Sequence, residues 1–504
     1  MDETTPSEPR PRSLPRRLPG WAPYAALLAL WGAALVGLGL LRTEPYGLEE
    51  AAARAILLNW TVLDRVVSPI VIFGAPDLRA LIFVPLGLYW PGSLLAVKVF
   101  TALAAFAAVL LLQRWVRRQE GEEAARLATG LLLIAPLTIS QIDAVGTGPY
   151  LLLCFALGPW LLERYGVKRR PLGGWFILQM LNAMVAVSLH PAGLAYPLAL
   201  AWEWHRRPLE PRHRRHYFIG LAAATLVILL MRLGWRGMAW LGDPVAALKP
   251  VLLGQLPGYT ETASAAWGAV PAALLVLLLV LDRQRIREDL LARTLALGLV
   301  LGSLAAGPAW AYLALAWLLA RGLPWLLRLN EAIPGQGLLA RRGLVLVALV
   351  GTAVLFTAGD RALRAVHLAG ALPDADQAIK ALALALEGRR EEARILSQWP
   401  ARTMLATRHP SFPLPPPPGE AEELLATVRQ TRAAYLLFDP RDPRNRQLAR
   451  AVSALSAEMK TVELLPRAVV VEIVYTQGDS QEGGASAGSW GTNSSSAVPA
   501  GRSG

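Results

Sequence analysis

The sequence predicts an all-α, multi-pass membrane protein that carries a small α/β domain near its C-terminus. Of its 504 residues, 54% are hydrophobic and only 17% are charged, whereas soluble domains are usually about 25% charged. The apolar residues stand in long uncharged runs such as 21–41 and 344–358. About 20 apolar residues are needed to cross a bilayer as a helix. These runs therefore indicate membrane spans rather than the cores of soluble domains.

The basic residues are distributed as the positive-inside rule requires. Lys and Arg outnumber Asp and Glu by 50 to 37, which gives a net charge of +13. They cluster in short loops between apolar runs and form no basic stripe interleaved with aromatic residues, so we expect no nucleic-acid partner. The single cysteine, Cys154, excludes an intramolecular disulfide and a thiolate metal cluster.

The apolar run at 21–41 predicts an uncleaved first span, because it exceeds the apolar region of a signal peptide. It follows a Pro- and Arg-rich tail, 1–20, that we expect to be disordered and cytoplasmic. Hydropathy predicts a membrane domain over 21–359 with about eleven helices in all. The further helices are expected near 94–113, 127–142, 148–163, 174–189, 191–204, 217–233, 265–281, 290–306, 308–327 and 344–359. With the N-terminus inside, basic clusters fall in the predicted internal loops 114–126, 164–170, 205–216, 282–289 and 328–342, and the region after 360 lies outside.

Two predicted outer segments are large. The first, 42–91, contains an amphipathic stretch at 48–63 and a semi-apolar stretch at 80–90, which we expect to be helices in the interface plane. The second, 360–476, alternates helix-like and strand-like pieces and so predicts a small α/β domain. Its helix-like pieces are 374–398, 419–431 and 445–460, its strand-like pieces are 403–407, 434–438 and 462–475, and 413–418 is an extended connector. The Gly- and Ser-rich tail, 477–504, is expected to be disordered.

Glu44 is the first candidate for chemistry, in the stretch LRTEPYGLEEAAARAI just beyond the first span. A carboxylate beside Arg42 at the membrane surface could act as a general base on a bound hydroxyl. The alternative is that Glu44 caps an interfacial helix while Glu49, Glu50 and Arg54 form a solvated face.

Asp143 is the second candidate, in the tight turn ISQIDAVGTGPY between the third and fourth spans. Acidic groups at membrane depth are costly, and they are therefore functional candidates by default. The alternative is an N-terminal cap on the following helix.

Three basic side chains are candidates at other outer turns. Arg232 and Arg236, in MRLGWRG, could grip the phosphate of a lipid with paired hydrogen bonds, or they could simply snorkel to headgroups. His190, in SLHPAG, could be a metal ligand or a proton carrier, or a turn residue that satisfies backbone groups.

Several motifs are absent from the sequence. It contains no phosphate-binding Gly-Lys-Ser/Thr loop, no H-E-x-x-H and no G-x-S-x-G. It also shows no pair of matching broken helices in two halves, the pattern that indicates a transporter.

The predicted layout has an inner N-terminus, a long outer loop that opens with an acid, some ten further spans and an outer C-terminal domain. This layout resembles that of the GT-C glycosyltransferases. These are the polyprenyl-phosphate-sugar-dependent enzymes related to protein O-mannosyltransferases and lipid A aminoarabinose transferases. The resemblance extends over roughly residues 20–475. The stretches that carry it are 83–118 (FVPLGLYWPGSLLAVKVFTALAAFAAVLLLQRWVRR), 124–165 and 402–440.

The resemblance implies a catalytic site. In this family, the proposed base is an acid just after the first span, usually in an Asp-Glu pair followed by Tyr. The match here is Glu44 with Tyr46, with Thr43 in place of the first acid and the pair Glu49 and Glu50 as the fallback. Tyr46, Glu49, Glu50 and His190 would line the substrate site.

The other candidates take roles by the same resemblance. Asp143 would position the acceptor or help bind a divalent metal, and Arg232 or Arg236 would hold the leaving lipid phosphate.

The implied function is sugar transfer, with inversion, from a polyprenyl-phosphate donor to a lipid, glycan or protein acceptor. It would take place on the outer face of a bacterial inner membrane. Two alternatives stay open: a catalytically inactive relative that serves as a binding or assembly protein, suggested by the broken acidic pair, and a polytopic transporter.

Overall fold

A computed structural model of the chain divides into two compact units, Met1–Pro373 and Asp374–Gly504. The structure describes residues 22–42, 44–64, 78–90, 93–165, 174–206, 211–236, 282–302, 308–322, 372–387, 393–415, 420–442 and 445–475, with isolated positions at 324, 349, 352–353, 356–357, 360 and 418. The predicted span 265–281, the loop 328–342, most of the span 344–359 and both predicted disordered tails lie outside the described residues.

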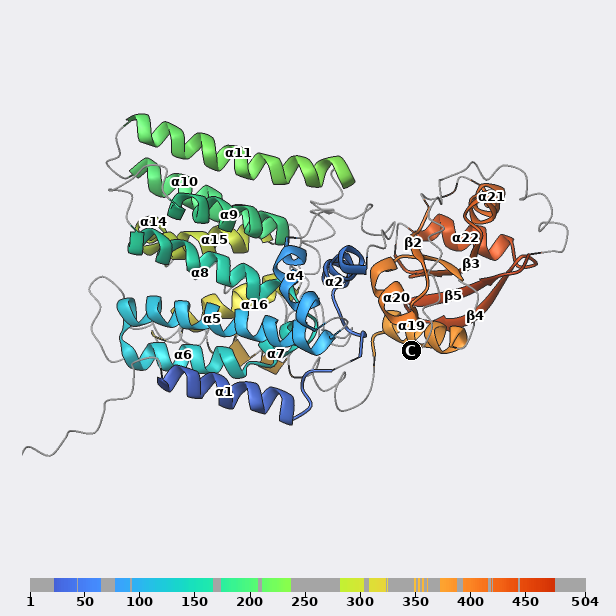
Figure 1. The fold of residues 1–504 in the computed structure, drawn as a ribbon, viewed down its shortest axis with the longest axis horizontal. Coiled ribbons are helices and arrows are strands. Elements are labelled where there is room, and N and C mark those ends of the chain that lie inside the picture. Colours follow the sequence, from blue (N-terminus) through green and yellow to red (C-terminus); the bar gives the residue numbers. More distant parts are fainter. Residues whose placement is uncertain are drawn as a thin grey trace, which may run out of the picture. The chain divides into compact units, whose positions relative to one another are not determined.

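The first unit is a bundle of helices (Figure 1). In chain order these are α1 (Ala22–Gly37), α2 (Glu50–Asp64), α4 (Arg79–Tyr89), α5 (Leu94–Glu120), α6 (Glu122–Ile134), α7 (Pro136–Asp143), α8 (Thr147–Tyr165), α9 (Gly174–Leu189), the 3-10 helix η1 (Pro191–Leu194), α10 (Ala195–Arg206), α11 (Pro211–Arg236), α14 (Arg283–Glu288), α15 (Leu290–Gly302), α16 (Pro308–Trp317) and the π-helix η4 (Leu318–Gly322). Each predicted span within the described residues is helical, and so are the two stretches expected in the interface plane.

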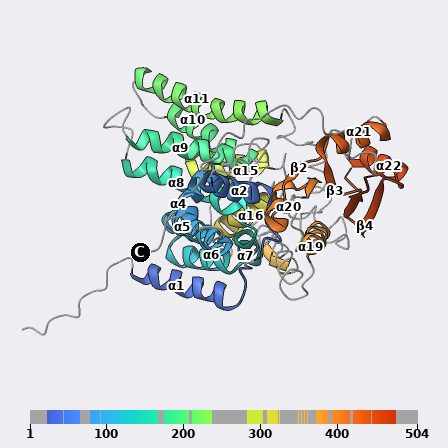
Figure 2. The ribbon, with the colours of Figure 1, turned by 45° about the vertical axis from the view of Figure 1, so that its right-hand side comes forward.

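The predicted third span is bent. It divides into α6 and α7, whose axes differ by 49°. Pro136 at the first position of α7 cannot donate a backbone hydrogen bond and disfavours helix at Ala135, so α6 ends there. α1 lies beside this bent pair and α5 (Figure 2). Its Leu35 belongs to the same buried apolar cluster as Ala105 of α5 and Ile142 of α7.

Helix length and surface composition give different support for a position in the membrane. Among the described residues, α5 is long and apolar enough to cross a bilayer, and the bent pair passes the same test as one span. The predicted number of about eleven spans is therefore not confirmed. The helices nevertheless expose large apolar side chains, among them Leu30, Leu103, Ile177 and Leu230. Soluble proteins rarely expose extensive apolar surface.

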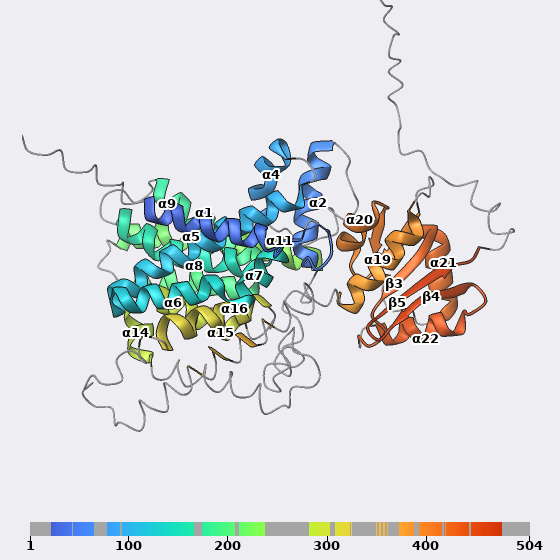
Figure 3. The ribbon, with the colours of Figure 1, turned by 90° about the horizontal axis from the view of Figure 1, so that it is seen from below.

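The second unit is a five-stranded sheet with helices on both faces. Its strands are β1 (Arg394–Ser397), β2 (Ser411–Pro413), β3 (Ala433–Phe438), β4 (Met459–Leu465) and β5 (Ala468–Ile473), in the order β2-β1-β3-β5-β4. The first three strands in sequence are parallel, and β5 runs antiparallel to both of its neighbours. Helices α19 (Asp374–Leu386) and α20 (Pro400–Thr407) cover one face, and α21 (Ala421–Thr431) and α22 (Arg446–Ala454) cover the other (Figures 1 and 3).

Three predictions in this unit are wrong in detail. The piece 403–407, predicted as a strand, lies in α20, because Pro400 stands at a helix N-terminus. The predicted helix 374–398 ends at Leu386, and its last residues form the buried strand β1. The predicted helix 445–460 ends at Ala454, and β4 begins at Met459 and forms a hairpin with β5.

Candidate functional site

A buried ion-pair cluster lies at the end of the bundle where α5 begins and α7 ends. Asp143, the last residue of α7, is 2% exposed, and Lys98 near the start of α5 is 0% exposed. The Lys98 ammonium donates to Asp143 Oδ1 across 2.6 Å. The attraction within a buried ion pair offsets the loss of hydration only where the geometry is good and further hydrogen bonds satisfy the remaining polar atoms. The two helices are therefore held together at this end.

Arg42, which follows α1, completes the pairing. Its backbone N–H donates to Asp143 Oδ1 at 2.9 Å, and its Nε donates to Oδ2 at 2.7 Å. Its Nη1 is buried and has no hydrogen-bond partner among the described residues. Buried donors are almost always satisfied, so this guanidinium retains capacity for a further acceptor. Arg42, Lys98 and Asp143 are called the Asp143 cluster below.

The chain after Arg42 folds back over the turn that follows α7. Gly47 has a left-handed φ of +76°, and a Cβ there would lie 2.0 Å from Arg42 Nη2. Only glycine allows both the φ angle and this close approach. Two residues later, the Glu49 N–H donates to the Ala144 carbonyl at 3.1 Å.

The turn after α7 contains a strained residue and is held by a hydrogen bond from α4. Val145 has a φ of +53°, which is rare for a β-branched residue and costs free energy. The fully buried Arg79 at the start of α4 donates to the Val145 carbonyl at 2.6 Å. α4, from the predicted outer loop, is thereby fixed to the same turn as the Asp143 cluster.

Glu44 lies beside the cluster. Its side chain is exposed, yet it is close enough to interact electrostatically with Lys98. Within the Asp143 cluster, the two positive charges of Arg42 and Lys98 exceed the single negative charge of Asp143. The site thus combines an exposed carboxylate with a net positive charge on the cluster beside it, which suits an anionic ligand.

Solved structures with this arrangement of helices exist. The crystal structure of ArnT from Cupriavidus metallidurans bound to undecaprenyl phosphate has a TM-score of 0.52 and 15% identity, over 90% of this chain and 99% of that one. Its apo form gives a TM-score of 0.51 and 15% identity, over 90% and 98%. The chain has the GT-C fold. No protein-family profile matches it, and no curated protein matches it in sequence.

The resemblance noted from the sequence is thus confirmed at the level of the GT-C fold. In this fold the structure brings Glu44 and Asp143, separated by about a hundred positions along the chain, to one end of the bundle. Tyr46 and Glu49 are half-buried in the segment between Arg42 and α2.

Two other predicted site residues, Glu50 and His190, interact with residues that are near to them in sequence. Glu50 forms an i,i+4 ion pair with Arg54 at 3.6 Å. His190 accepts a hydrogen bond from the Ala192 N–H through Nδ1 at 3.1 Å and so caps η1. Capping matches the plainer of the two alternatives for His190.

Arg232 and Arg236 lie in the last turns of α11, and their side chains are outside the described part of the structure. Their predicted contact with a lipid phosphate stays a prediction.

A divalent metal does not fit the Asp143 carboxylate well. Both of its oxygens accept hydrogen bonds from Arg42 and Lys98, so a metal would have to displace a buried cation. Over the described ranges, no three His, Cys, Asp or Glu side chains gather as a metal site would require.

Sequence reasoning did not select Lys98 and Arg79 as site residues. Lys98 is a lone charge in the apolar run LLAVKVF, and a charge within a span is itself a functional signal. Arg79 lay among the other charges of the outer loop, and no local pattern distinguishes it from a solvated residue.

Proposed function

We propose that this chain is a membrane glycosyltransferase that moves a sugar from a polyprenyl-phosphate donor to an acceptor hydroxyl. The fold is that of ArnT, and the structure of that protein was determined with undecaprenyl phosphate bound. The apolar helices and their exposed apolar side chains support a position in the membrane. The predicted orientation places the Asp143 cluster at the outer face.

One observation carries the proposal: Glu44, an exposed carboxylate, lies beside a buried cationic cluster whose Arg42 Nη1 lacks an acceptor. A phosphate at headgroup level would supply that acceptor, since guanidinium groups bind phosphate oxygens through charge-assisted hydrogen bonds. Inversion requires that the acid and the phosphate lie on opposite sides of the sugar's anomeric carbon.

The reaction follows from these two roles. Glu44 accepts the proton of the acceptor hydroxyl, and the hydroxyl oxygen forms a bond to the anomeric carbon. The bond between that carbon and the phosphate oxygen breaks, which inverts the configuration. Arg42 stabilises the negative charge that develops on the departing lipid phosphate.

Lys98 and Asp143 act through Arg42. Lys98 is fully buried, so it positions the Asp143 carboxylate, and Asp143 in turn holds Arg42 at both its backbone N–H and its guanidinium Nε. Arg232 and Arg236 from α11 would add further positive charge around the same phosphate, and Tyr46, Glu49, Glu50 and His190 would line the acceptor side.

The variant Glu44→Gln tests the proposal. General-base action contributes about 10²–10⁴-fold to a rate, so we expect sugar transfer to fall by that factor. The measurement is release of labelled sugar from a panel of polyprenyl-phosphate sugars by the purified chain in lipid. Folding should be unchanged, because Glu44 is exposed.

Glu122→Gln is the matched control. It removes the same charge from a partly exposed carboxylate in the first turn of α6, just beyond the C-terminal end of α5, and it should keep the full rate. Transfer at the wild-type rate by Glu44→Gln would eliminate Glu44 as the base. No transfer by the wild-type chain from any donor would favour the inactive relative.

A further inference from the structure

A second recess, distant from the Asp143 cluster, lies near the C-terminal end of α5. Arg114, Trp115 and Arg118 from α5 line it together with Trp160 and Glu163 from α8. Its volume of about 20 Å³ is far below the roughly 300–1,000 Å³ of pockets for small organic ligands. The recess therefore admits only a small part of a ligand, such as the oxygen atoms of a headgroup, and the rest of the ligand lies outside it.

The recess has an unsatisfied donor. Arg114 Nε is buried and has no hydrogen-bond partner among the described residues, whereas Arg118 is already paired with Glu163. Two arginines and one glutamate leave one net positive charge. An anion with several acceptor oxygens, such as a phosphate, would accept the hydrogen bond of Arg114 and balance this charge.

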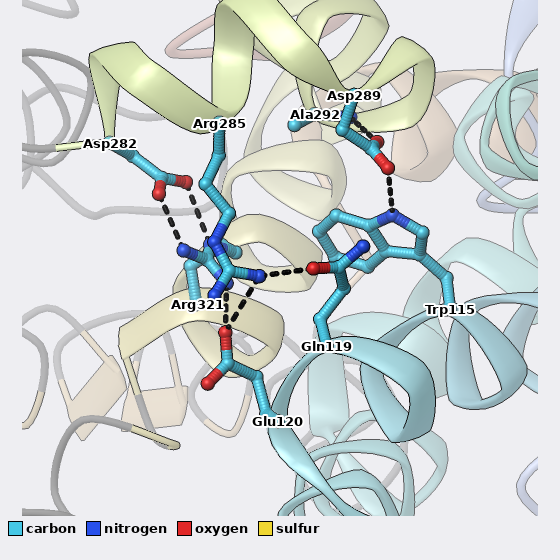
Figure 4. Close-up of polar contacts among 8 residues, drawn as sticks. All are labelled: Trp115, Gln119, Glu120, Asp282, Arg285, Asp289, Ala292 and Arg321. Carbon is cyan, nitrogen blue, oxygen red and sulfur yellow. Dashed lines mark hydrogen bonds and ion pairs between the residues drawn. The ribbon is translucent and has the colours of Figure 1, made fainter.

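The wall of the recess is held in place by a second ion-pair network (Figure 4). The Trp115 indole N–H donates to Asp289 at 3.0 Å, and the Arg321 guanidinium lies 6.0 Å from the centre of the Trp115 ring. Arg321, 2% exposed, pairs with Asp282 and Glu120. The indole ring is therefore fixed before any ligand binds.

We propose that this recess binds the headgroup phosphate of an anionic phospholipid in the leaflet opposite the sugar-transfer site. Basic pockets between helices on the cytoplasmic side select anionic headgroups, and tryptophan side chains favour the membrane interface. Arg114 binds the phosphate oxygens, and Trp115 and Trp160 flank the glycerol region. This inference rests on the membrane position in the proposed function but not on catalysis.

Native mass spectrometry of the full chain in zwitterionic detergent, titrated with phosphatidylglycerol or phosphatidylcholine, tests the proposal. We expect phosphatidylglycerol to bind more tightly, and Arg114→Gln/Arg118→Gln to weaken it by roughly tenfold or more. The matched control is Arg117→Gln/Arg126→Gln, which removes two exposed charges at the same end and should change affinity far less.

Three results would overturn the proposal: equal loss of affinity in the control pair, unchanged affinity in the Arg114→Gln/Arg118→Gln variant, or displacement of the lipid by an equal concentration of inorganic phosphate. Glu44→Gln should retain wild-type lipid affinity. Lipid binding by a wild-type chain that transfers no sugar from any donor would refute the proposed function and leave the lipid site standing.

Discussion

The carboxylate of Asp143 is shared by two cations that come from different parts of the chain. Lys98 and Arg42 approach it from α5 and from the segment after α1. Removal of one partner from a buried pair leaves an uncompensated charge, which is far more costly than removal of both. The single variant should therefore be less stable than the double variant in which both partners are replaced.

Asp143→Asn should lower the free energy of unfolding by about 3–5 kcal/mol, because Lys98 is left buried without its carboxylate. The double variant Asp143→Asn/Lys98→Met should recover part of that loss. Thermal unfolding of the purified chain in detergent measures both. Equal stability of the single and double variants would contradict a coupled pair.

For single residues, the sequence indicated the two acids as candidates but did not indicate the side chains that pair with Asp143. Glu44 and Asp143 are conspicuous because carboxylates are rare next to apolar runs. The partnership of Asp143 with Lys98 depends on how α5 and α7 pack, and nothing in the two local sequences encodes it. The left-handed φ of Val145 likewise depends on Arg79, which is distant in sequence.

The helices of the bundle were more predictable than the elements of the sheet. α9 spans the predicted 174–189 without any difference, because an uncharged apolar run with clear ends leaves little choice of structure. In the second unit the pieces are short, and tertiary packing decides between strand and helix. The segments around Leu396 and Thr403 show this most clearly.

The close packing of η1 against α9 predicts that stability is sensitive to substitution at Gly193. A Cβ on Gly193 in η1 would lie 1.8 Å from the Ala186 carbonyl oxygen of α9. Since that contact is with backbone, Gly193→Ala should lower stability by about 1–3 kcal/mol or more. Gly130→Ala in α6, where the described residues place no atom from outside its own helical turn within 4 Å of the new Cβ, should be neutral or slightly stabilising. Equal thermal midpoints for the two variants would refute the packing.

At the scale of the whole molecule, the second unit has a core of its own. Leu436, Val471 and Val428 are all fully buried between the sheet and its helices. A fragment of residues 372–475 should therefore fold alone with one cooperative thermal transition, followed by circular dichroism. Leu436→Ala in that fragment should cost about 2–5 kcal/mol. A fragment that melts without a transition would show that the unit depends on the bundle.

The bundle has a different charged site toward each end of α5. One end presents Glu44 beside the Asp143 cluster, and the other presents the recess at Arg114. If both proposals hold, sugar transfer and phospholipid binding occur in opposite leaflets of the same membrane.

Photolabelling with a polyprenyl phosphate that carries a photoreactive group near its phosphate tests the site of sugar transfer most directly. After irradiation of the full chain in lipid, mass spectrometry locates the adducts. We expect them in the segment from Glu44 to Glu50 or at the start of α5 near Lys98, and unlabelled polyprenyl phosphate should suppress them. Competed adducts confined to the other end of α5, around Arg114 and Trp160, would contradict the assignment of the donor phosphate to the Asp143 cluster.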